Sequence, residues 1–380
     1  MVSIEIPEAV VADTERNRDA LGKPGASLVT KLRCISRLRL LSAVSSEGCI
    51  GRFARINQDD FHSSRSPIPV RYDLVAHVAA KPLLKWAGGK RQLLPALRRF
   101  YPAEFGQYVE PFLGSGAVFF DLYNAGRLRG KQAVLIDSNA DLIGCYEAVR
   151  DMPEDVGRAL DRLAAGHAAD PRGHYYLVRD GRFNPLRERL RQADGGIVYT
   201  PQLAAMLIYL NRTGFNGLFR VNSKGVFNVP AGRYQKPNIS DRDRLFAVSE
   251  ALRAPGVRLR VGSFETARDL AKKGDFLYFD PPYAPVSATA RFTAYTSRTF
   301  GTTDQQRLQE VVVTLVRRGC HVVVSNSTAK EIERLYEVNA EARAAGLTAH
   351  RATARRSVNS NAERRGPVSE YLITNVPVGA

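Results

Sequence analysis

From Lys81 onward, short apolar runs that end in Gly or Asp alternate with segments of helical periodicity. This alternation is typical of strands and helices arranged around a parallel sheet. Expected strands lie at residues 107–110, 133–136, 276–279, 321–325 and 371–374, and expected helices at 90–100, 117–124, 140–150 and 304–318. The sequence therefore predicts an α/β fold.

Between about residues 151 and 260 this alternation stops. An Arg-rich segment with helical periodicity comes first, followed by a Gly- and Asn-rich segment, NRTGFNGLFRVNSKGVFNVPAGRY, at 211–234. Within it, VNSKGVFNV has polar, Gly-containing residues between β-branched and aromatic ends, which predicts a β-hairpin. We therefore expect an inserted, mainly helical domain at 151–260, with residues 81–150 and 261–380 forming the two parts of the main domain.

Residues 1–80 are weakly periodic and mixed in charge, and we expect an N-terminal extension or flexible arm. They hold 11 Lys and Arg against 9 Asp and Glu, whereas the whole chain holds 55 against 38, a net charge of +17. The basic surplus therefore belongs to residues 81–380. It favours an anionic partner without distinguishing nucleic acid from a membrane surface.

The chain has 380 residues, of which 44% are apolar, so it can bury a substantial core. No stretch approaches the roughly 20 consecutive apolar residues of a membrane span. Cys34, Cys49, Cys145 and Cys320 form no C-x-x-C pair, which argues against a zinc site or a disulfide framework. The first 20 residues lack the pattern of a secretory signal. We expect a soluble, cytoplasmic protein.

A glycine-containing turn follows the first expected strand, in YVEPFLGSGAVFF at 108–120. Gly114 and Gly116 let the backbone approach a ligand closely at the mouth of a sheet. Asp137 ends the next strand about 20 residues later, where nucleotide-binding sheets place an acid that binds ribose hydroxyls. These features fit NAD, FAD or S-adenosyl-methionine, and equally a tight turn with a helix-capping Asp.

The segment DFLYFDPPY places Asp280, Pro281, Pro282 and Tyr283 after an apolar strand. Prolines fix the backbone, so Asp280 and the Pro281 carbonyl can present two rigid acceptors beside an aromatic ring. Two acceptors suit an exocyclic base amine, because they hold both hydrogens and favour a lone pair that points at a methyl donor, while Tyr283 stacks on the base. Asp280 then accepts the released proton, and no metal is expected. The alternative is a Pro-stiffened turn.

The segment KPLLKWAGGKRQLLP at 81–95 contains Trp86, the only tryptophan of the chain. Its ring can pack on an adenine, and Lys90 can meet a carboxylate near a helix start. A core Trp beside solvated lysines is an equally good interpretation. The segment is not a phosphate-binding P-loop, because GGK lacks the four-residue spacer and the Ser or Thr.

Five stretches together resemble the Dam-type (D12 class) N6-adenine-specific DNA methyltransferases. They are LKWAGGK, EPFLGSG, NRTGFNGLFRVNSKGVFNVPAGRY, FDPPYAPVSATARFTAY and RRSVNSN, in this order. The resemblance runs through about residues 81–375 and does not reach 1–80. It implies a Rossmann-like methyltransferase sheet with an inserted target-recognition domain that carries the hairpin. It also implies methyl transfer from S-adenosyl-methionine to N6 of adenine in double-stranded DNA, by base flipping within GATC.

The resemblance assigns roles to residues by their position in the matched motifs. It implies that S-adenosyl-methionine is bound by Trp86, Lys90, Phe112, Gly114, Gly116, Asp137 and Asp280. The flipped adenine would lie at Asp280 to Tyr283. DNA contacts are implied for Lys85, Phe215, Asn216, Leu218, Arg220 and Pro230.

Two of these DNA-contacting positions have a physical argument of their own. The family commonly carries Tyr where this chain has Phe215, so a hydroxyl contact is lost there while stacking is kept. The guanidinium of Arg220 matches the N7 and O6 acceptors of guanine in the major groove.

Three alternatives remain at the level of sequence. The Asp-Pro-Pro-Tyr geometry serves any exocyclic amine, so an amino-methyltransferase acting on cytosine N4 or on RNA is the nearest, although the hairpin text argues against it. A catalytically silent DNA-binding regulator would retain the same fold, but every expected catalytic position is filled. An NAD-dependent enzyme lacks residues to handle a hydride. We expect a monomer, whether solitary or paired with a restriction nuclease.

Overall fold

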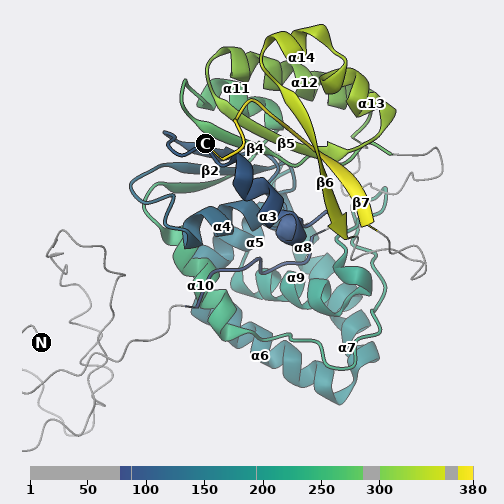
Figure 1. The fold of residues 1–380 in the computed structure, drawn as a ribbon. Helices are drawn as coiled ribbons and strands as arrows, with labels where there is room; N and C mark the ends of the chain where they lie inside the picture. Colours follow the sequence, from purple (N-terminus) through teal and green to yellow (C-terminus); the bar gives the residue numbers. More distant parts are fainter. Residues whose placement is uncertain (1–77, 87, 194, 286–299, 356–366, 380) are drawn as a thin grey trace, which may run out of the picture. The chain divides into compact units, whose positions relative to one another are not determined.

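The computed structural model describes residues 78–379 apart from 87, 194, 286–299 and 356–366, and residues 1–77, most of the expected extension, lie outside that range. The described chain forms a seven-stranded sheet with the order β3-β2-β1-β4-β5-β7-β6 (Figure 1). The strands are β1 (Tyr108–Glu110), β2 (Ala133–Asp137), β3 (Val257–Val261), β4 (Phe276–Phe279), β5 (His321–Ser327), β6 (Thr348–Arg355) and β7 (Pro367–Thr374).

Strands β3, β2, β1, β4 and β5 are parallel, and the last two strands, β7 and β6, run antiparallel to their neighbours. The α/β class and a mostly parallel sheet are therefore confirmed. Each of the five expected strands is present. The structure adds β3 and β6, which the sequence did not predict and which form the two edges of the sheet.

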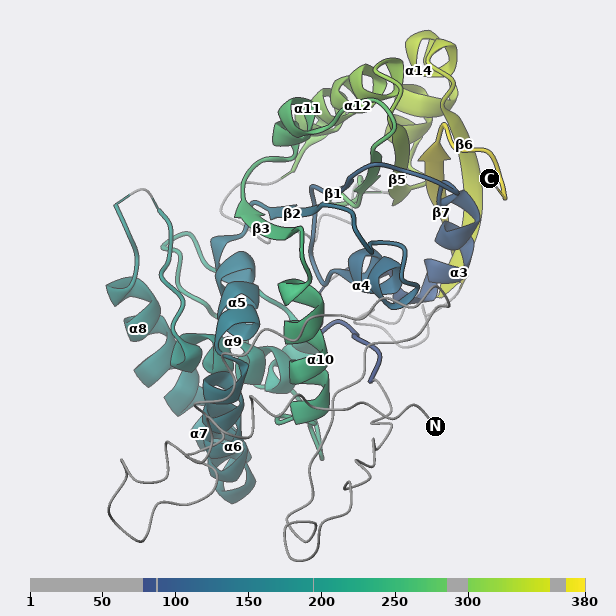
Figure 2. The same ribbon diagram turned by 90° about the vertical axis from the view of Figure 1, so that its left-hand side faces the viewer.

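Strand side chains alternate between two hydrophobic cores, one on each face of the sheet. In β4, Phe276 and Tyr278 join the first core, whereas Leu277 and Phe279 join the second. The two helix layers lie on opposite faces of the sheet (Figures 1 and 2). The first core is covered by α3 (Leu94–Leu97), α4 (Ala117–Asn124), α5 (Ala140–Asp151) and α10 (Arg242–Arg253); the second by α11 (Ala267–Leu270), α12 (Thr302–Arg317), α13 (Lys330–Ile332) and α14 (Ala340–Ala344).

The helix expected at 90–100 is broken into three pieces. A 3-10 turn at Lys90–Gln92 precedes α3, and another at Arg98–Phe100 follows it. Pro95 lies in the first turn of α3, where its missing N–H is tolerated but a continuous helix from residue 90 is not.

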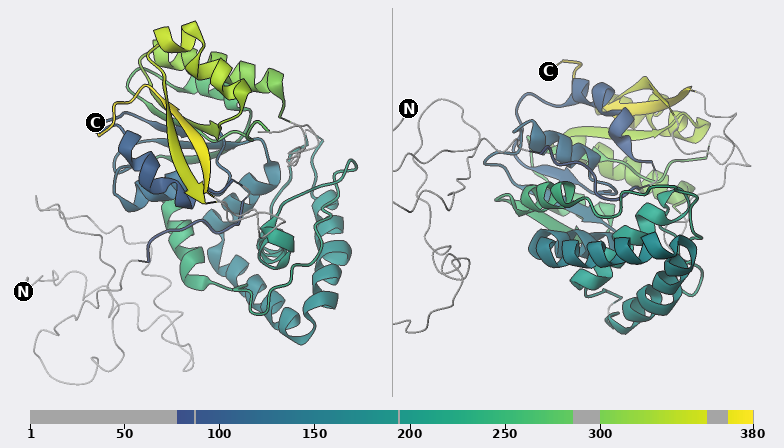
Figure 3. Two further views of the ribbon diagram at one scale, coloured as in Figure 1. Left: turned by 45° about the vertical axis from the view of Figure 1, so that its right-hand side comes forward. Right: turned by 90° about the horizontal axis from the view of Figure 1, so that it is seen from below.

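Between α5 and α10 the chain is mainly helical, as the sequence predicts. This segment contains α6 (Pro153–Ala169), α7 (Pro171–Tyr176), a π-helical turn (Leu177–Phe183), α8 (Asn184–Arg189) and α9 (Pro201–Thr213). In Figure 3 it forms a teal layer beside the part that carries the sheet. Helix α9 lies inside this layer, and its residues from Leu203 to Thr213 are all buried. Helix α10 and β3 then return the chain to the sheet.

The segment after α9 doubles back on itself at the expected hairpin. Val221 and Phe227 form an antiparallel bridge, and the Asn222 N–H donates to the Val226 carbonyl at 2.9 Å. Gly225 adopts φ of +74°, which the reversal needs and glycine permits. The pairing consists of isolated bridges, including one between Gly214 and Ala231, and not of two regular strands.

Within the described ranges, no helix has the length and apolarity needed to cross a bilayer. Cys145 and Cys320 are buried free thiols. Cys34 and Cys49 lie outside the described residues.

Candidate active site

Three acidic residues lie at the carboxyl ends of neighbouring parallel strands. Glu110 ends β1, Asp137 ends β2 and Asp280 directly follows β4. Because β2, β1 and β4 are adjacent and parallel, these ends meet at one edge of the sheet. In open α/β sheets this edge is where ligands bind.

Both recorded contacts of Asp280 involve the same carboxylate oxygen. Lys90 Nζ lies 2.7 Å from Asp280 Oδ1, and the Ser325 hydroxyl donates to that oxygen at 3.1 Å. No described residue donates to Oδ2. The Lys90 side chain is 6% exposed and that of Asp280 is 20% exposed. One oxygen is thus held in place while the other remains able to accept a hydrogen bond.

The electrostatics of Asp280 combine two opposed effects. Burial raises the pKa of its carboxyl, and the Lys90 ammonium opposes this rise by attraction and by its hydrogen bond. Burial is the larger effect, so the pKa lies above the ordinary value of 3.8. Lys90 therefore holds the pKa of this carboxyl below the level that burial alone would give.

The residues after Asp280 are held by side chains from three other elements. Tyr283 donates its hydroxyl to Glu370 of β7 at 2.8 Å, and its ring centroid lies 4.5 Å from Lys90 Nζ. Gln305 of α12 donates to the Pro282 carbonyl at 2.9 Å. No described residue donates to the Pro281 carbonyl. The loop is therefore fixed, while an acceptor on Pro281 and one on Asp280 are left over.

Sequence reasoning missed the residues that support this loop. Ser325 contacts Asp280, and Asn326 donates to Gln305 at 3.0 Å, which in turn holds Pro282. A signal was present, because the polar Ser325 and Asn326 follow an apolar run at the end of an expected parallel strand. Glu370 carried no such signal. The second half of the FDPPYAPVSATARFTAY stretch and most of RRSVNSN lie outside the described residues.

The glycine turn after β1 is tied to Asp137. The Gly114 N–H donates to Asp137 Oδ2 at 3.0 Å, and the Asn139 N–H donates to Oδ1 at 2.9 Å. Gly114 and Gly116 adopt φ of +49° and +69°. Burial raises the pKa of Asp137 to about 6, and the Gly114 N–H opposes the rise. The sequence-predicted turn and acid therefore form one hydrogen-bonded unit.

Trp86 closes the glycine turn from the side. A Cβ atom on Gly114 would lie 3.1 Å from Trp86 Cδ1, so only glycine fits beside this ring without displacement. The Trp86 ring also stacks on Phe219, with centroids 5.8 Å apart. Phe112 stacks on Phe264 at 5.4 Å and packs against the second core. The structure therefore brings Trp86 together with the glycine turn.

The candidate DNA-contacting residues gather around the segment at 211–234. Asn211 joins Lys85 to this segment, because its amide bonds both backbone groups of Lys85 and the Gly217 carbonyl, each at 2.8 Å. The Phe215 side chain is 44% exposed, and its N–H donates to the Pro230 carbonyl at 2.8 Å. Leu218 is half-buried.

Two further positions on this segment have distinctive conformations. Asn216 has φ of +54°, the only positive value among the described non-glycine residues. Arg220 is exposed, and its Nε donates to the Asn228 side chain at 2.8 Å, which orients the guanidinium. Among the described residues, no three His, Cys, Asp or Glu side chains are grouped as a metal site requires.

Comparison with known proteins adds independent information. Residues 86–351 match the family model of the D12 class N6 adenine-specific DNA methyltransferases. A type II methyltransferase of Lactococcus lactis subsp. cremoris is 38% identical over 300 residues, covering 78% of this chain and 95% of the relative. A type II methyltransferase of Methanocaldococcus jannaschii is 35% identical over 78% of this chain and 99% of its own length. The DNA adenine methylase of Salmonella typhi is 33% identical over 77% of this chain and 95% of its own length.

Proposed function

The chain belongs to the family of D12 class N6 adenine-specific DNA methyltransferases, and from this premise we propose that it methylates N6 of adenine within GATC, with S-adenosyl-methionine as methyl donor. The observation that carries the proposal is a pair of hydrogen-bond acceptors, just after the carboxyl end of β4, to which no described residue donates. These are Asp280 Oδ2 and the Pro281 carbonyl, beside the Tyr283 ring.

The two acceptors match the donors of an exocyclic amine. An adenine amine has two N–H groups, and one hydrogen bond to each acceptor fixes the orientation of the nitrogen. The Tyr283 ring supplies a face on which the base stacks. Its hydroxyl bond to Glu370 keeps that ring in place.

Lys90 and Ser325 determine which oxygen of Asp280 meets the amine. Both contact Oδ1, so Oδ2 is the oxygen that faces the substrate. The amine nitrogen would take the methyl group as its bond to the sulfonium sulfur breaks, and the nitrogen would then release a proton. Asp280 Oδ2, already hydrogen-bonded to the amine, would accept that proton. The raised pKa of Asp280 makes it a better proton acceptor than an exposed carboxylate.

The glycine turn and Asp137 fit the nucleoside part of the methyl donor. Gly114 and Gly116 hold the positive φ of the turn and leave room for the packed side chains beside it, Trp86 at Gly114 and Phe120 at Gly116. Asp137 is the acid that would accept ribose hydroxyls. Trp86 would contact the same molecule. When bound, S-adenosyl-methionine supplies a methyl group activated by a positively charged sulfur. Lys90, which the resemblance assigns to this ligand, would also hold Asp280 by its ion pair.

We assign DNA recognition to the helical segment at 151–260 and to the hairpin that follows α9. The exposed ring of Phe215 would enter the duplex beside Asn216, and the base opposite would flip toward Tyr283. Arg220 would contact a guanine, with Lys85, Leu218 and Pro230 close to the same base pairs. The arrangement of these side chains on one connected segment supports this assignment.

The experiment that tests the proposal is methylation of a mixed-sequence duplex library with S-adenosyl-methionine, followed by sequencing of the modified sites. We expect modified adenines within GATC and few elsewhere. Methylation of adenine in another sequence would overturn the GATC assignment alone. N4-methylcytosine, detected by mass analysis of the nucleosides, would overturn the assignment of the amine.

A further inference from the structure

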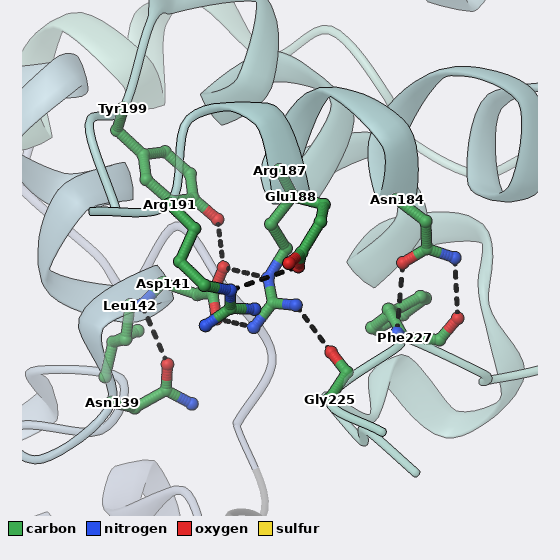
Figure 4. Close-up of polar contacts among 10 residues, drawn as sticks. All are labelled: Asn139, Asp141, Leu142, Asn184, Arg187, Glu188, Arg191, Tyr199, Gly225 and Phe227. Carbon is green, nitrogen blue, oxygen red and sulfur yellow. Dashed lines mark hydrogen bonds and ion pairs between the residues drawn. The ribbon is translucent and has the colours of Figure 1, made fainter. Parts of the chain in front are cut away.

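A buried ion pair lies between the hairpin and the carboxyl end of β2, where the proposed cofactor site contains Asp137 (Figure 4). Asp141 of α5 and Arg187 of α8 are 4% and 6% exposed, and they form a bidentate pair with Nε–Oδ1 of 2.6 Å and Nη2–Oδ2 of 2.7 Å. The Tyr199 hydroxyl donates to Asp141 Oδ1 at 2.9 Å. The planar guanidinium fork makes this geometry more directional than a Lys ammonium would.

One side of this pair leads to the proposed ribose-binding acid. Asp137 Oδ1 accepts the Asn139 N–H at 2.9 Å, and Asn139 Oδ1 accepts the N–H groups of Asp141 and Leu142 at the start of α5. Asn139 is therefore the one residue that links Asp137 to Asp141 in this series of hydrogen bonds. Asn139, the N-cap of α5, thus connects Asp137 to the end of the helix from which Asp141 projects.

The other side of the pair leads to the turn of the hairpin. The third nitrogen of Arg187, Nη1, donates to the Gly225 carbonyl at 2.6 Å. One turn earlier on α8, Asn184 exchanges two hydrogen bonds with the backbone of Phe227, each 3.0 Å long. Figure 4 shows both contacts reaching the hairpin from the same helix. The backbone carbonyl of Arg220, whose side chain is the proposed guanine reader, accepts the Asn228 N–H at 3.1 Å on the adjacent backbone.

We propose that Arg187 is a positioning residue that couples cofactor binding to DNA recognition through the contacts Asp137–Asn139–Asp141–Arg187–Gly225. The proposal rests on the function proposed above. Cofactor at Asp137 stabilises the arrangement in which the hairpin is held against α8, and DNA on the hairpin stabilises the same arrangement. Each ligand therefore strengthens the binding of the other, by the same factor in both directions.

The test is a pair of binding titrations that involve no turnover. The affinity of a duplex with one GATC site is measured with and without saturating S-adenosyl-homocysteine, and the ratio is the coupling factor. We expect about tenfold for the wild-type chain, within the usual range of such couplings. Arg187→Lys keeps a positive charge beside Asp141, but all its donors lie on one nitrogen, so it cannot reproduce the separate Nε, Nη1 and Nη2 contacts of the guanidinium. We expect its coupling factor to fall to about one, with cofactor affinity in the absence of DNA unchanged.

Arg158→Lys is the matched control. Arg158 pairs with Asp155 on the exposed surface of α6 and contacts neither the cofactor edge nor the hairpin. The control should keep the wild-type coupling factor. If Arg187 only stabilises the fold, Arg187→Lys will lower the melting temperature, or will weaken DNA binding equally with and without S-adenosyl-homocysteine. The coupling factor would then stay at its wild-type value, and the proposal would be wrong.

Two further measurements cover a variant that fails to fold. The double variant Asp141→Asn/Arg187→Gln removes both charges together and should also lose the coupling. In the wild-type chain alone, S-adenosyl-homocysteine without DNA should slow amide exchange in residues 222–228, and unchanged exchange would overturn the proposal.

The same wild-type preparation is assayed for N6-methyladenine, to separate a failure of the proposed function from a failure of the coupling. Its absence counts against the proposed function, whereas methylation with a coupling factor of one counts against Arg187 alone.

Discussion

At the scale of single residues, the proposed chemistry depends on the contact between Lys90 and Asp280. Burial disfavours the charged form of Asp280, and the nearby ammonium favours it. The carboxylate is the form that accepts a hydrogen bond and a proton, so activity should fall as the pH drops through the pKa of Asp280. That pKa lies above 3.8, the ordinary value for Asp.

Lys90→Gln should therefore move the acidic limb of the rate profile to higher pH. The substitution removes the charge that lowers the Asp280 pKa and leaves the burial that raises it. Single-turnover rates measured across pH report the midpoint directly, independent of any loss of cofactor affinity. Lys131→Gln is the control, because Lys131 faces Glu104 at a partly exposed site. A limb that stays in place or moves to lower pH would contradict this account.

The sequence predicts which residues form the proposed catalytic loop but not which residues hold that loop in place. Asp280 to Tyr283 are identifiable because an apolar strand and two prolines fix where their groups point. Ser325, Gln305 and Glu370 contact that loop only because β5, α12 and β7 are brought beside it by the strand order. Such contacts are set by tertiary packing, which short-range patterns in the sequence do not encode.

At the scale of elements, the turn after β1 combines a backbone conformation that needs glycine with the proposed cofactor site. Gly114→Ala should destabilise the fold by about 1–2 kcal/mol, because an L-residue is strained at positive φ. It should also weaken cofactor binding, since the new Cβ displaces Trp86. Urea denaturation and a cofactor titration measure the two effects separately.

Gly130→Ala is the matched control for this substitution. Gly130 also has positive φ, at +70°, but a Cβ there would meet no atom within 4 Å. It should show a similar loss of stability with unchanged cofactor affinity. Equal cofactor affinity in the two variants would argue against a role for the glycine turn in cofactor binding.

The hairpin supports a separate prediction about sequence discrimination. Arg220→Ala should reduce discrimination at one guanine by about 1–3 kcal/mol, because a bidentate guanidinium contact is lost. Methylation rates on GATC duplexes and on duplexes with one changed base pair measure this difference. Arg158→Ala, which removes an exposed Arg on α6, should leave discrimination unchanged. Equal rate loss on matched and mismatched duplexes would assign Arg220 to nonspecific binding.

The strands that the sequence failed to predict share a physical reason. Strand β3, VRLRV, has Arg at alternate positions and little buried surface. Strand β6, TAHRATAR, consists mostly of small, polar and charged residues and lacks an apolar run. Both lie at the edges of the sheet, where a strand pairs on one side only. The interior strand β4, FLYF, is buried on both faces, and the sequence predicts its bounds correctly.

At the scale of the whole molecule, the charge and the match to relatives both point to residues 78–380 as the functional unit. Residues 1–80 contribute almost nothing to the net charge of +17. Ala80 is anchored by two hydrogen bonds with the Asn124 side chain, of 3.0 and 2.8 Å. The relatives match about 300 residues of this chain over nearly their full length.

A chain that begins at Val78 should therefore retain the methylation rate and the salt dependence of DNA binding. Salt dependence reports the number of phosphate contacts made by Lys and Arg. A comparison of the full chain and the shortened chain over a range of salt concentrations measures it. A lower slope for the shortened chain would assign DNA contacts to the N-terminal residues.

The central claim is that Asp280 presents one oxygen to the adenine amine while Lys90 and Ser325 hold the other. Asp280→Asn tests it with almost no change in shape. Two donors would hold the amide oxygen at the Oδ1 position, so the amide NH2 would replace the acceptor at Oδ2 and face the N–H groups of the base.

The decisive measurement is the yield of N6-methyladenine, by mass analysis of nucleosides, from a GATC duplex treated with S-adenosyl-methionine and either the wild-type chain or Asp280→Asn. The account predicts N6-methyladenine from the wild type and a rate at least about 100-fold lower for the variant, with DNA binding retained. Equal rates for the two proteins, or a wild type that forms no N6-methyladenine, would contradict it.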